Sequence, residues 1–256
     1  MYASVSSVQL FYESITPTTI RNNAVTLLFL HEALGSIGQW KNFPQDLCNA
    51  LGMNGIVYDR QGHGRSSGFS KQRDARYLHD YAWTELPQFM NAVFREDQQI
   101  LLIGHSDGGT IALLYAHRYP ERVKGVCTMA AHVINEPETI AGIAPAVHAY
   151  HQGKLNALKK YHGDKTEALF YAWANTWRDA SFNNWDITGE IAQKTMPGLF
   201  IQGAEDQYGT VQQLELIKKR YKNGKAVLLK NCGHHPHLEQ REKSISLICK
   251  WVKDLD

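Results

Sequence analysis

The chain has 256 residues, with 27 Lys and Arg against 25 Asp and Glu and a formal net charge of +2. Hydrophobic residues make up 43% of it and charged residues 20%, which is typical of a folded globular protein and excludes a disordered one. The nearly balanced charge predicts no binding patch for nucleic acid or for a membrane surface, and every apolar run is too short to span a bilayer. The densest basic stretch, residues 218–225, is interpreted as the solvated end of a helix and a turn.

Four cysteines are scattered along the chain without the CxxC spacing of a redox or metal site. They are Cys48, Cys127, Cys232 and Cys249. Such a pattern predicts reduced thiols in a cytoplasmic protein. The first residues also lack the basic and apolar regions of a signal peptide. We therefore expect a cytoplasmic location, and no cofactor is predicted.

Short apolar runs recur along the chain and are predicted to be strands. They are apolar throughout rather than alternating, which is typical of parallel strands buried on both faces. These runs cover residues 25–31, 54–60, 99–106, 123–131, 196–203 and 225–231. Residues 2–13 alternate more and predict an antiparallel edge strand.

Helical patterns lie between the apolar runs, at residues 37–51, 74–95, 107–118, 210–222 and 238–254. This alternation of strands and helices predicts an α/β fold with a doubly wound, mostly parallel sheet and helices on both faces.

Residues 132–195 interrupt the alternation, because they are too many for a single crossover between neighbouring strands. The segment is helical in pattern and rich in aromatic residues, which predicts an inserted helical cap over the carboxyl edge of the sheet. Most of these aromatic side chains are expected to form the core of the cap, and a few to face a pocket. The predicted division is an α/β core of residues 1–131 and 196–256 and a cap of residues 132–195.

The segment GHSDG at residues 104–108 lies between a predicted strand and a predicted helix. This is the context of a nucleophile elbow, where a serine stands on a sharp turn from strand to helix. The elbow needs small residues two positions before and after the serine, and Gly104 and Gly108 meet that need. The alternative interpretation of Ser106 is a helix cap, since serine is also common at helix starts.

A serine hydroxyl needs a base to become a nucleophile, and the base needs a carboxylate to orient it. Asp206 follows the next-to-last predicted strand, and His234 lies in a turn after the last one. Both fall at carboxyl ends of strands, where open α/β sheets bind ligands, and the acid precedes the histidine as this arrangement requires. We predict the triad Ser106, Asp206 and His234, with Glu205 as the alternative acid.

Two backbone N–H groups are needed to stabilise the negative charge of a tetrahedral intermediate. The amide of Asp107, at a helix N-terminus, and the amide of Ala33, in the loop after the first buried strand, are the candidates. Pocket candidates adjoin these groups or lie in the predicted cap: Glu32, Leu34, His105, Trp173 and Trp177. The run HHPH at 234–237 could suggest zinc, but Pro236 breaks the helix that a ligand pair would need, so no metal site is predicted.

Five motifs together resemble those of the α/β-hydrolase superfamily over the whole chain. They are HEALGS (31–36), DRQGHGRS (59–66), GHSDGG (104–109), GAEDQYG (203–209) and CGHHPHLE (232–239). The resemblance implies an α/β-hydrolase fold with Ser106 as nucleophile, Asp206 as acid, His234 as base and the amides of Ala33 and Asp107 as the oxyanion hole. Many relatives have Gly at the position of Glu32, which here puts a carboxylate near the oxyanion loop.

The resemblance also places His63 and Arg65 on a loop near the same edge, where we expect them first to structure the loop and second to contact the substrate. A serine at the elbow argues against haloalkane dehalogenases and epoxide hydrolases, which use aspartate there. We expect a serine hydrolase that cleaves a small carboxylic ester or related acyl compound through an acyl-enzyme. Thioester or C–C bond hydrolysis on the same triad is an alternative, and a non-catalytic receptor for a small ligand is another. The only partner predicted is a small-molecule acyl substrate, and the oligomeric state is not predicted.

Overall fold

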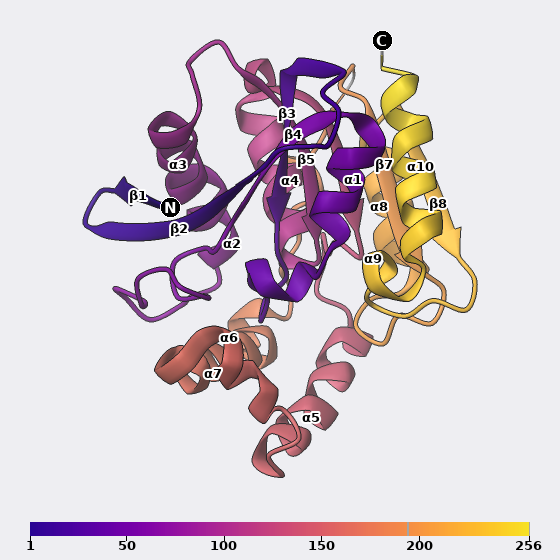
Figure 1. The fold of residues 1–256 in the computed structure, drawn as a ribbon. Helices are drawn as coiled ribbons and strands as arrows, with labels where there is room; N and C mark the ends of the chain where they lie inside the picture. Colours follow the sequence, from indigo (N-terminus) through magenta and orange to yellow (C-terminus); the bar gives the residue numbers. More distant parts are fainter. Residues whose placement is uncertain (194, 256) are drawn as a thin grey trace.

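The computed structural model describes residues 1–193 and 195–255 (Figure 1). Lys194 and Asp256, which belong to the predicted cap and core, lie outside the described residues. A central sheet with helices on both faces dominates the structure. In chain order its strands are β1 (Tyr2–Val5), β2 (Val8–Ile15), β3 (Asn22–Leu30), β4 (Met53–Tyr58), β5 (Gln99–His105), β6 (Val123–Met129), β7 (Gly198–Gly203) and β8 (Gly224–Leu229).

The strands follow the order β1-β2-β4-β3-β5-β6-β7-β8 across the sheet. The first two pairs are antiparallel and the other five are parallel, which confirms the predicted doubly wound, mostly parallel sheet. The prediction of a single edge strand over residues 2–13 is wrong, because the chain reverses there into a hairpin. Val5 pairs with Val8, and Ser6 adopts a φ of 52° in the turn. No Gly or Asn marks this turn, so the sequence pattern did not reveal it.

The two faces of the sheet are covered by different helices, each packed on its own hydrophobic cluster (Figure 1). On one face lie α1 (Phe43–Leu51) and α10 (Arg241–Lys253), which contact each other. On the other lie α3 (Leu86–Val93), α4 (Asp107–Arg118) and α8 (Val211–Arg220). Because each parallel strand buries side chains on both faces, the strands are held rigidly and their carboxyl ends can position reactive groups.

Three of the predicted helices are interrupted. The pattern at 37–51 becomes a 3₁₀ turn, η1 (Ile37–Trp40), followed by α1, and Lys41 between them has a φ of 54°. The pattern at 238–254 divides into α9 (Pro236–Glu239) and α10.

The third interrupted helix, at 74–95, consists of α2 (Tyr77–Asp80), a π-helical turn η2 (Tyr81–Glu85) and α3. Pro87 lies in the first turn of α3, and because it has no N–H it cannot donate the regular helical bond. The wider π turn directly precedes it, and such turns are often found near functional sites.

The segment 132–195 contains α5 (Pro137–His151), α6 (Lys159–His162) and α7 (Thr166–Arg178), which lie together at the lower end of Figure 1. Phe170, Trp177 and Phe182 of this segment are fully or almost fully buried and belong to the same hydrophobic cluster as α4. The segment is therefore packed against the α/β core by apolar contact. Over the described residues, 1–193 and 195–255, no helix has both the length and the apolar character that crossing a bilayer requires.

Candidate active site

Ser106 stands on the sharp turn between β5 and α4, with φ 52° and ψ −119°. A residue with a side chain rarely adopts this backbone conformation, and it persists only where the surroundings enforce it. A side chain at Gly104 would collide with the carbonyl of Gly108, and one at Gly108 would collide with the carbonyl of Leu30. The two glycines therefore allow the helix to approach the strand closely enough to form the turn.

The same geometry bears on the alternative interpretation of Ser106 as a helix cap. An N-cap serine has an extended backbone and accepts a hydrogen bond at its side chain from an amide of the first turn. Ser106 has a positive φ, and its hydroxyl makes no capping hydrogen bond to α4, a helix that is described over its full length. The side chain is thus free to face the cavity that it lines.

Asp206 and His234 meet at the carboxyl ends of β7 and β8. The Nδ1 of His234 lies 2.9 Å from both carboxylate oxygens of Asp206. The carboxylate also accepts hydrogen bonds from the Tyr208 amide, at 2.9 Å, and from the Gln202 side chain, at 2.7 Å. The neighbouring carboxylate, that of Glu205, belongs to an exposed residue. Of the two candidate acids, Asp206 is therefore the one that contacts the histidine.

Each member of this pair shifts the pKa of the other. Burial by itself would raise the pKa of Asp206, but the charge and hydrogen bond of His234 outweigh it and hold this pKa below its usual range. Burial would likewise lower the pKa of His234, whereas Asp206 raises it above its usual value. A neutral His234 donates Nδ1–H to Asp206 and leaves Nε2 able to accept a proton.

The loop after β3, which carries the predicted oxyanion donor Ala33, is fixed through its backbone carbonyls. The guanidinium of Arg60 donates to the carbonyls of His31 and Glu32, the second at 2.8 Å. The Nε2 of His63 lies 3.0 Å from the carbonyl of Ala33, which it binds when that nitrogen carries the proton. Because each carbonyl shares a planar peptide unit with the following amide, these hydrogen bonds also fix the orientation of the loop amides.

A fourth carbonyl of the loop is held from the segment 132–195. His162, the last residue of α6, lies with Nε2 2.9 Å from the carbonyl of Leu34. Its Nδ1 accepts a hydrogen bond from the amide of Gly64 at 2.9 Å, so the ring proton is on Nε2. Burial lowers the pKa of His162 to about 4, and the ring is neutral at pH 7. No sequence motif marks His162, since it lies far along the chain from the loop it contacts.

A cavity of about 590 Å³ brings the predicted residues together. It is lined by Ser106, His234 and both predicted oxyanion residues, and by four of the five predicted pocket residues, namely Glu32, Leu34, Trp173 and Trp177. The fifth, His105, does not line it. This side chain lies behind His234, with Nε2 2.7 Å from the His234 carbonyl, and thus supports the histidine from the core.

Sequence reasoning missed two side chains that line this cavity and a third, Tyr77, that contacts two of its lining residues. Tyr208 and His132 line it, and the Nε2 of His132 lies 2.9 Å from the Tyr208 carbonyl. Tyr77 donates a hydrogen bond to the Asp107 carboxylate at 2.9 Å and accepts one from Trp177 at 2.7 Å. The Asp107 carboxylate therefore has a hydrogen-bond partner outside the proposed triad.

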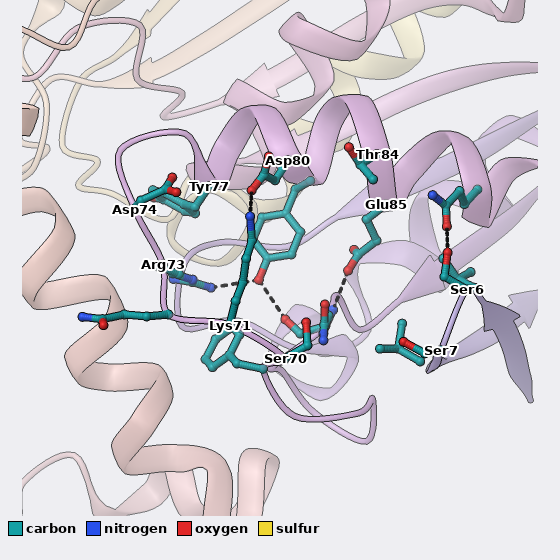
Figure 2. A pocket seen from close by; sticks show the side chains of 17 residues that line it. Ser6, Ser7, Ser70, Lys71, Arg73, Asp74, Tyr77, Asp80, Thr84 and Glu85 are labelled. Carbon is teal, nitrogen blue, oxygen red and sulfur yellow. Dashed lines mark hydrogen bonds and ion pairs between the residues drawn. The ribbon is translucent and has the colours of Figure 1, made fainter.

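A second cavity, of about 330 Å³, lies between the β1–β2 turn, the loop at residues 69–74 and the helical stretch that follows (Figure 2). Two of its lining residues, Lys71 and Asp80, form an exposed ion pair of 2.6 Å, whereas Glu85 is buried. Burial raises the pKa of Glu85 to about 7. None of the predicted catalytic residues lines this cavity. Among the described residues, no group of three or more His, Cys, Asp and Glu side chains is arranged to hold a metal ion.

Comparison with known proteins identifies the family to which this fold belongs. A sequence model of the alpha/beta hydrolase fold matches residues 25–186, more than half of the chain. The chain belongs to the α/β-hydrolase fold family, and it is a hydrolase of that family.

Individual relatives are distant. The chain is 24% identical to a proline iminopeptidase of Saccharolobus solfataricus, over 98% of this chain and 91% of that protein. It is 23% identical to a 2-hydroxymuconate semialdehyde hydrolase of Pseudomonas sp. (strain CF600), over 90% and 87%. The crystal structure of a proline iminopeptidase from Mycobacterium smegmatis superposes with a TM-score of 0.73 at 15% identity, over 100% of this chain and 98% of that one, which shows the shared fold.

Proposed function

We propose that this protein is a serine hydrolase that cleaves a small carboxylic ester or related acyl compound, with Ser106, His234 and Asp206 as its catalytic triad. One observation carries the proposal. A histidine held by a buried carboxylate at 2.9 Å lines the same cavity as a serine on a strained strand-to-helix turn. Nucleophile, base and orienting acid are the three groups that serine-based acyl transfer needs.

In the proposed mechanism, His234 takes the proton of the Ser106 hydroxyl at Nε2, and the serine oxygen attacks the acyl carbon. The amides of Ala33 and Asp107 stabilise the oxyanion that forms, and Asp206 stabilises the protonated His234. The protonated histidine then gives its proton to the leaving alcohol. In the second half of the reaction, His234 takes a proton from water, the water oxygen attacks the acyl carbon, and the bond from that carbon to the Ser106 oxygen breaks. His234 returns the proton to Ser106 as the acid is released. In this proposal the segment 132–195 acts as a cap that closes the cavity.

Cleavage of an amide or peptide bond at an N-terminal residue is the second candidate. It is favoured by the full-length similarity to proteins named proline iminopeptidase, and the same triad would perform it. Hydrolysis of a thioester or a C–C bond remains an alternative on this triad, the latter in line with the similarity to a semialdehyde hydrolase. A cytoplasmic location, which rests on the scattered cysteines, is also part of the proposal.

Turnover of p-nitrophenyl butyrate by the wild type and by Ser106→Ala tests the proposal. We expect wild-type turnover and a loss of roughly 10⁴-fold or more in kcat/KM for the variant. An additional screen of aminoacyl p-nitroanilides, with the same pair of proteins, tests the peptidase candidate. If the wild type hydrolyses no compound of either kind and still binds small apolar esters, the receptor interpretation replaces the hydrolase.

A further inference from the structure

Apart from histidines, the ionisable side chains with an ordinary charge at pH 7 that line the Ser106 cavity are all acidic. Its described lining includes the carboxylates of Glu32 and Asp107 and contains no Lys or Arg. The Asp107 carboxylate accepts a hydrogen bond from Tyr77, and the residue is buried, with 2% of its surface exposed. Glu32 is the carboxylate that remains available to a molecule bound in the cavity.

Glu32 has no strong counter-charge of its own. In the described parts of the chain, the one basic group within ion-pair distance of its carboxylate is His235, whose Nε2 lies 4.0 Å from Oε1. That separation exceeds a hydrogen bond. Burial also lowers the pKa of His235, so its ring is neutral near pH 7. The Glu32 side chain keeps 21% of its surface exposed and can meet a ligand.

Two lysines lie farther away and do not neutralise this carboxylate. Lys41 and Lys154 line an adjoining cavity of about 280 Å³, which also has Glu32 on its wall. Both residues are exposed, and Lys41 donates a hydrogen bond to the hydroxyl of Tyr161 at 2.7 Å. Exposed charges are screened by water and salt, whereas a partly buried carboxylate in a cavity is screened much less.

The cavity that Glu32 lines also has aromatic residues in its wall, which suit a cation. Trp173, Trp177 and Tyr208 line the same cavity, and the faces of aromatic rings attract quaternary and protonated amines. Glu32 also directly precedes Ala33, the proposed oxyanion donor, so its carboxylate belongs to the loop against which the reacting carbonyl would be placed. The Glu32 carboxylate, the aromatic lining residues and the absence of Lys and Arg from the described lining all favour a cationic ligand.

We propose that Glu32 is a specificity-determining residue that selects substrates carrying a positively charged amine within a few bonds of the acyl carbon. The proposal rests on the serine hydrolase function proposed above. It identifies the substrate class as cationic acyl compounds and disfavours anionic ones, because an anion beside Glu32 would meet a carboxylate, and no Lys or Arg of the described chain lines the cavity to offset it.

The test compares p-nitrophenyl esters that differ only at the end of the acyl chain: trimethylammonium, the isosteric tert-butyl group, or a sulfonate. For the wild type at low ionic strength, we expect kcat/KM for the trimethylammonium ester to exceed that for the tert-butyl ester by roughly tenfold, and the sulfonate ester to be the poorest. In Glu32→Gln, kcat/KM for the trimethylammonium ester should be about equal to that for the tert-butyl ester. The ratio of two esters on one variant cancels any general change in folding or chemistry.

Glu138→Gln is the matched control, since Glu138 is an exposed carboxylate on α5 that does not line the cavity. It should keep the wild-type ratio. Ester hydrolysis without a charge preference, or a preference unchanged in Glu32→Gln, would overturn the proposal and leave the hydrolase intact.

Binding gives a readout that does not depend on turnover. By titration calorimetry, butyltrimethylammonium should bind to Ser106→Ala and bind at least tenfold more weakly when Glu32→Gln is added. If no ester is hydrolysed but this difference is found, the hydrolase proposal fails and the cation site stands. If neither is found, both fail.

Discussion

Two buried carboxylates of this molecule have shifted pKa values, and the shifts have opposite signs: Asp206 holds a histidine that lines the Ser106 cavity, and Glu85 lines the cavity of Figure 2. Near Ser106, the histidine beside Asp206 holds the pKa of that carboxyl low in spite of burial. In the cavity of Figure 2, burial dominates and raises the pKa of Glu85 to about 7. A shifted pKa is a recognised pointer to a functional site, yet buried structural carboxylates show it too.

The difference between the two cavities lies in what converges on them. Asp206 is one of three groups that meet at the carboxyl ends of β5, β7 and β8. Glu85 accepts hydrogen bonds from the Gln61 amide, at 2.9 Å, and from the Tyr58 hydroxyl, at 3.4 Å, and so ties a loop to a helix. The convergence of reactive groups, rather than the size of a pKa shift, locates the candidate active site.

The largest effect that separates the two cavities is expected from Asp206→Asn. An amide cannot stabilise the protonated His234, so kcat/KM for p-nitrophenyl butyrate should fall by roughly 10³ to 10⁴-fold. Steady-state kinetics measure this, with Glu205→Gln as the control because Glu205 is the adjacent, exposed carboxylate. A greater loss in Glu205→Gln than in Asp206→Asn would move the acid to position 205.

A smaller effect is expected from His162, which holds the oxyanion loop from α6. His162→Ala frees the Leu34 carbonyl and the Gly64 amide, so kcat should fall by about tenfold with a smaller change in KM. His162→Gln should recover most of the rate, because an amide side chain can both donate and accept. Equal losses of kcat in both variants, or a change confined to thermal stability, would mean that His162 does not position the loop.

The smallest effect on activity is expected from Glu85→Gln, which should keep kcat/KM within about threefold and change the pH dependence of stability. Because the pKa of Glu85 rises from 4.5 to about 7 on folding, the folded protein binds this proton more tightly than the unfolded chain does. Its stabilisation is present in full below about pH 4.5 and is lost as the pH rises through 7, on the order of 3 kcal/mol.

Urea denaturation at several pH values between 4.5 and 8 measures this term. As the pH rises, the unfolding free energy of the wild type should decrease relative to that of Glu85→Gln. A difference that stays constant over this range would show that Glu85 keeps an ordinary pKa in the folded protein. A large loss of activity in Glu85→Gln would contradict the view that Glu85 has a structural role and that only the Ser106 cavity is catalytic.

The parallel sheet could be predicted because its strands are apolar throughout and alternate with helical patterns. The β1–β2 hairpin could not, since a Ser-Ser turn has no characteristic residue at its positive φ. The position of Ser106 followed from its local motif. The pairing of Asp206 with His234 was predicted from their order and their places at strand ends, and the structure brings them within hydrogen-bond distance.

The supports of the site were largely beyond sequence reasoning. His162 reaches the loop after β3 from a helix more than a hundred residues away, and Tyr77 reaches Asp107 from the turn before η2. Such contacts depend on how the helices pack, and no local pattern encodes them. His105 was predicted to line the pocket because it precedes the nucleophile in sequence, and this prediction is wrong. Successive side chains along a strand point to opposite sides, and His105 lies behind His234 instead.

Covalent labelling tests the central claim, that Ser106 is the nucleophile, most directly. The wild type is incubated with a fluorophosphonate, and the modified residue is identified by mass spectrometry of the digested protein. We predict one stoichiometric adduct, located on Ser106, that is absent in Ser106→Ala and forms far more slowly in Asp206→Asn. An adduct on another residue, or an unmodified wild type that still hydrolyses esters, would contradict the assignment of Ser106.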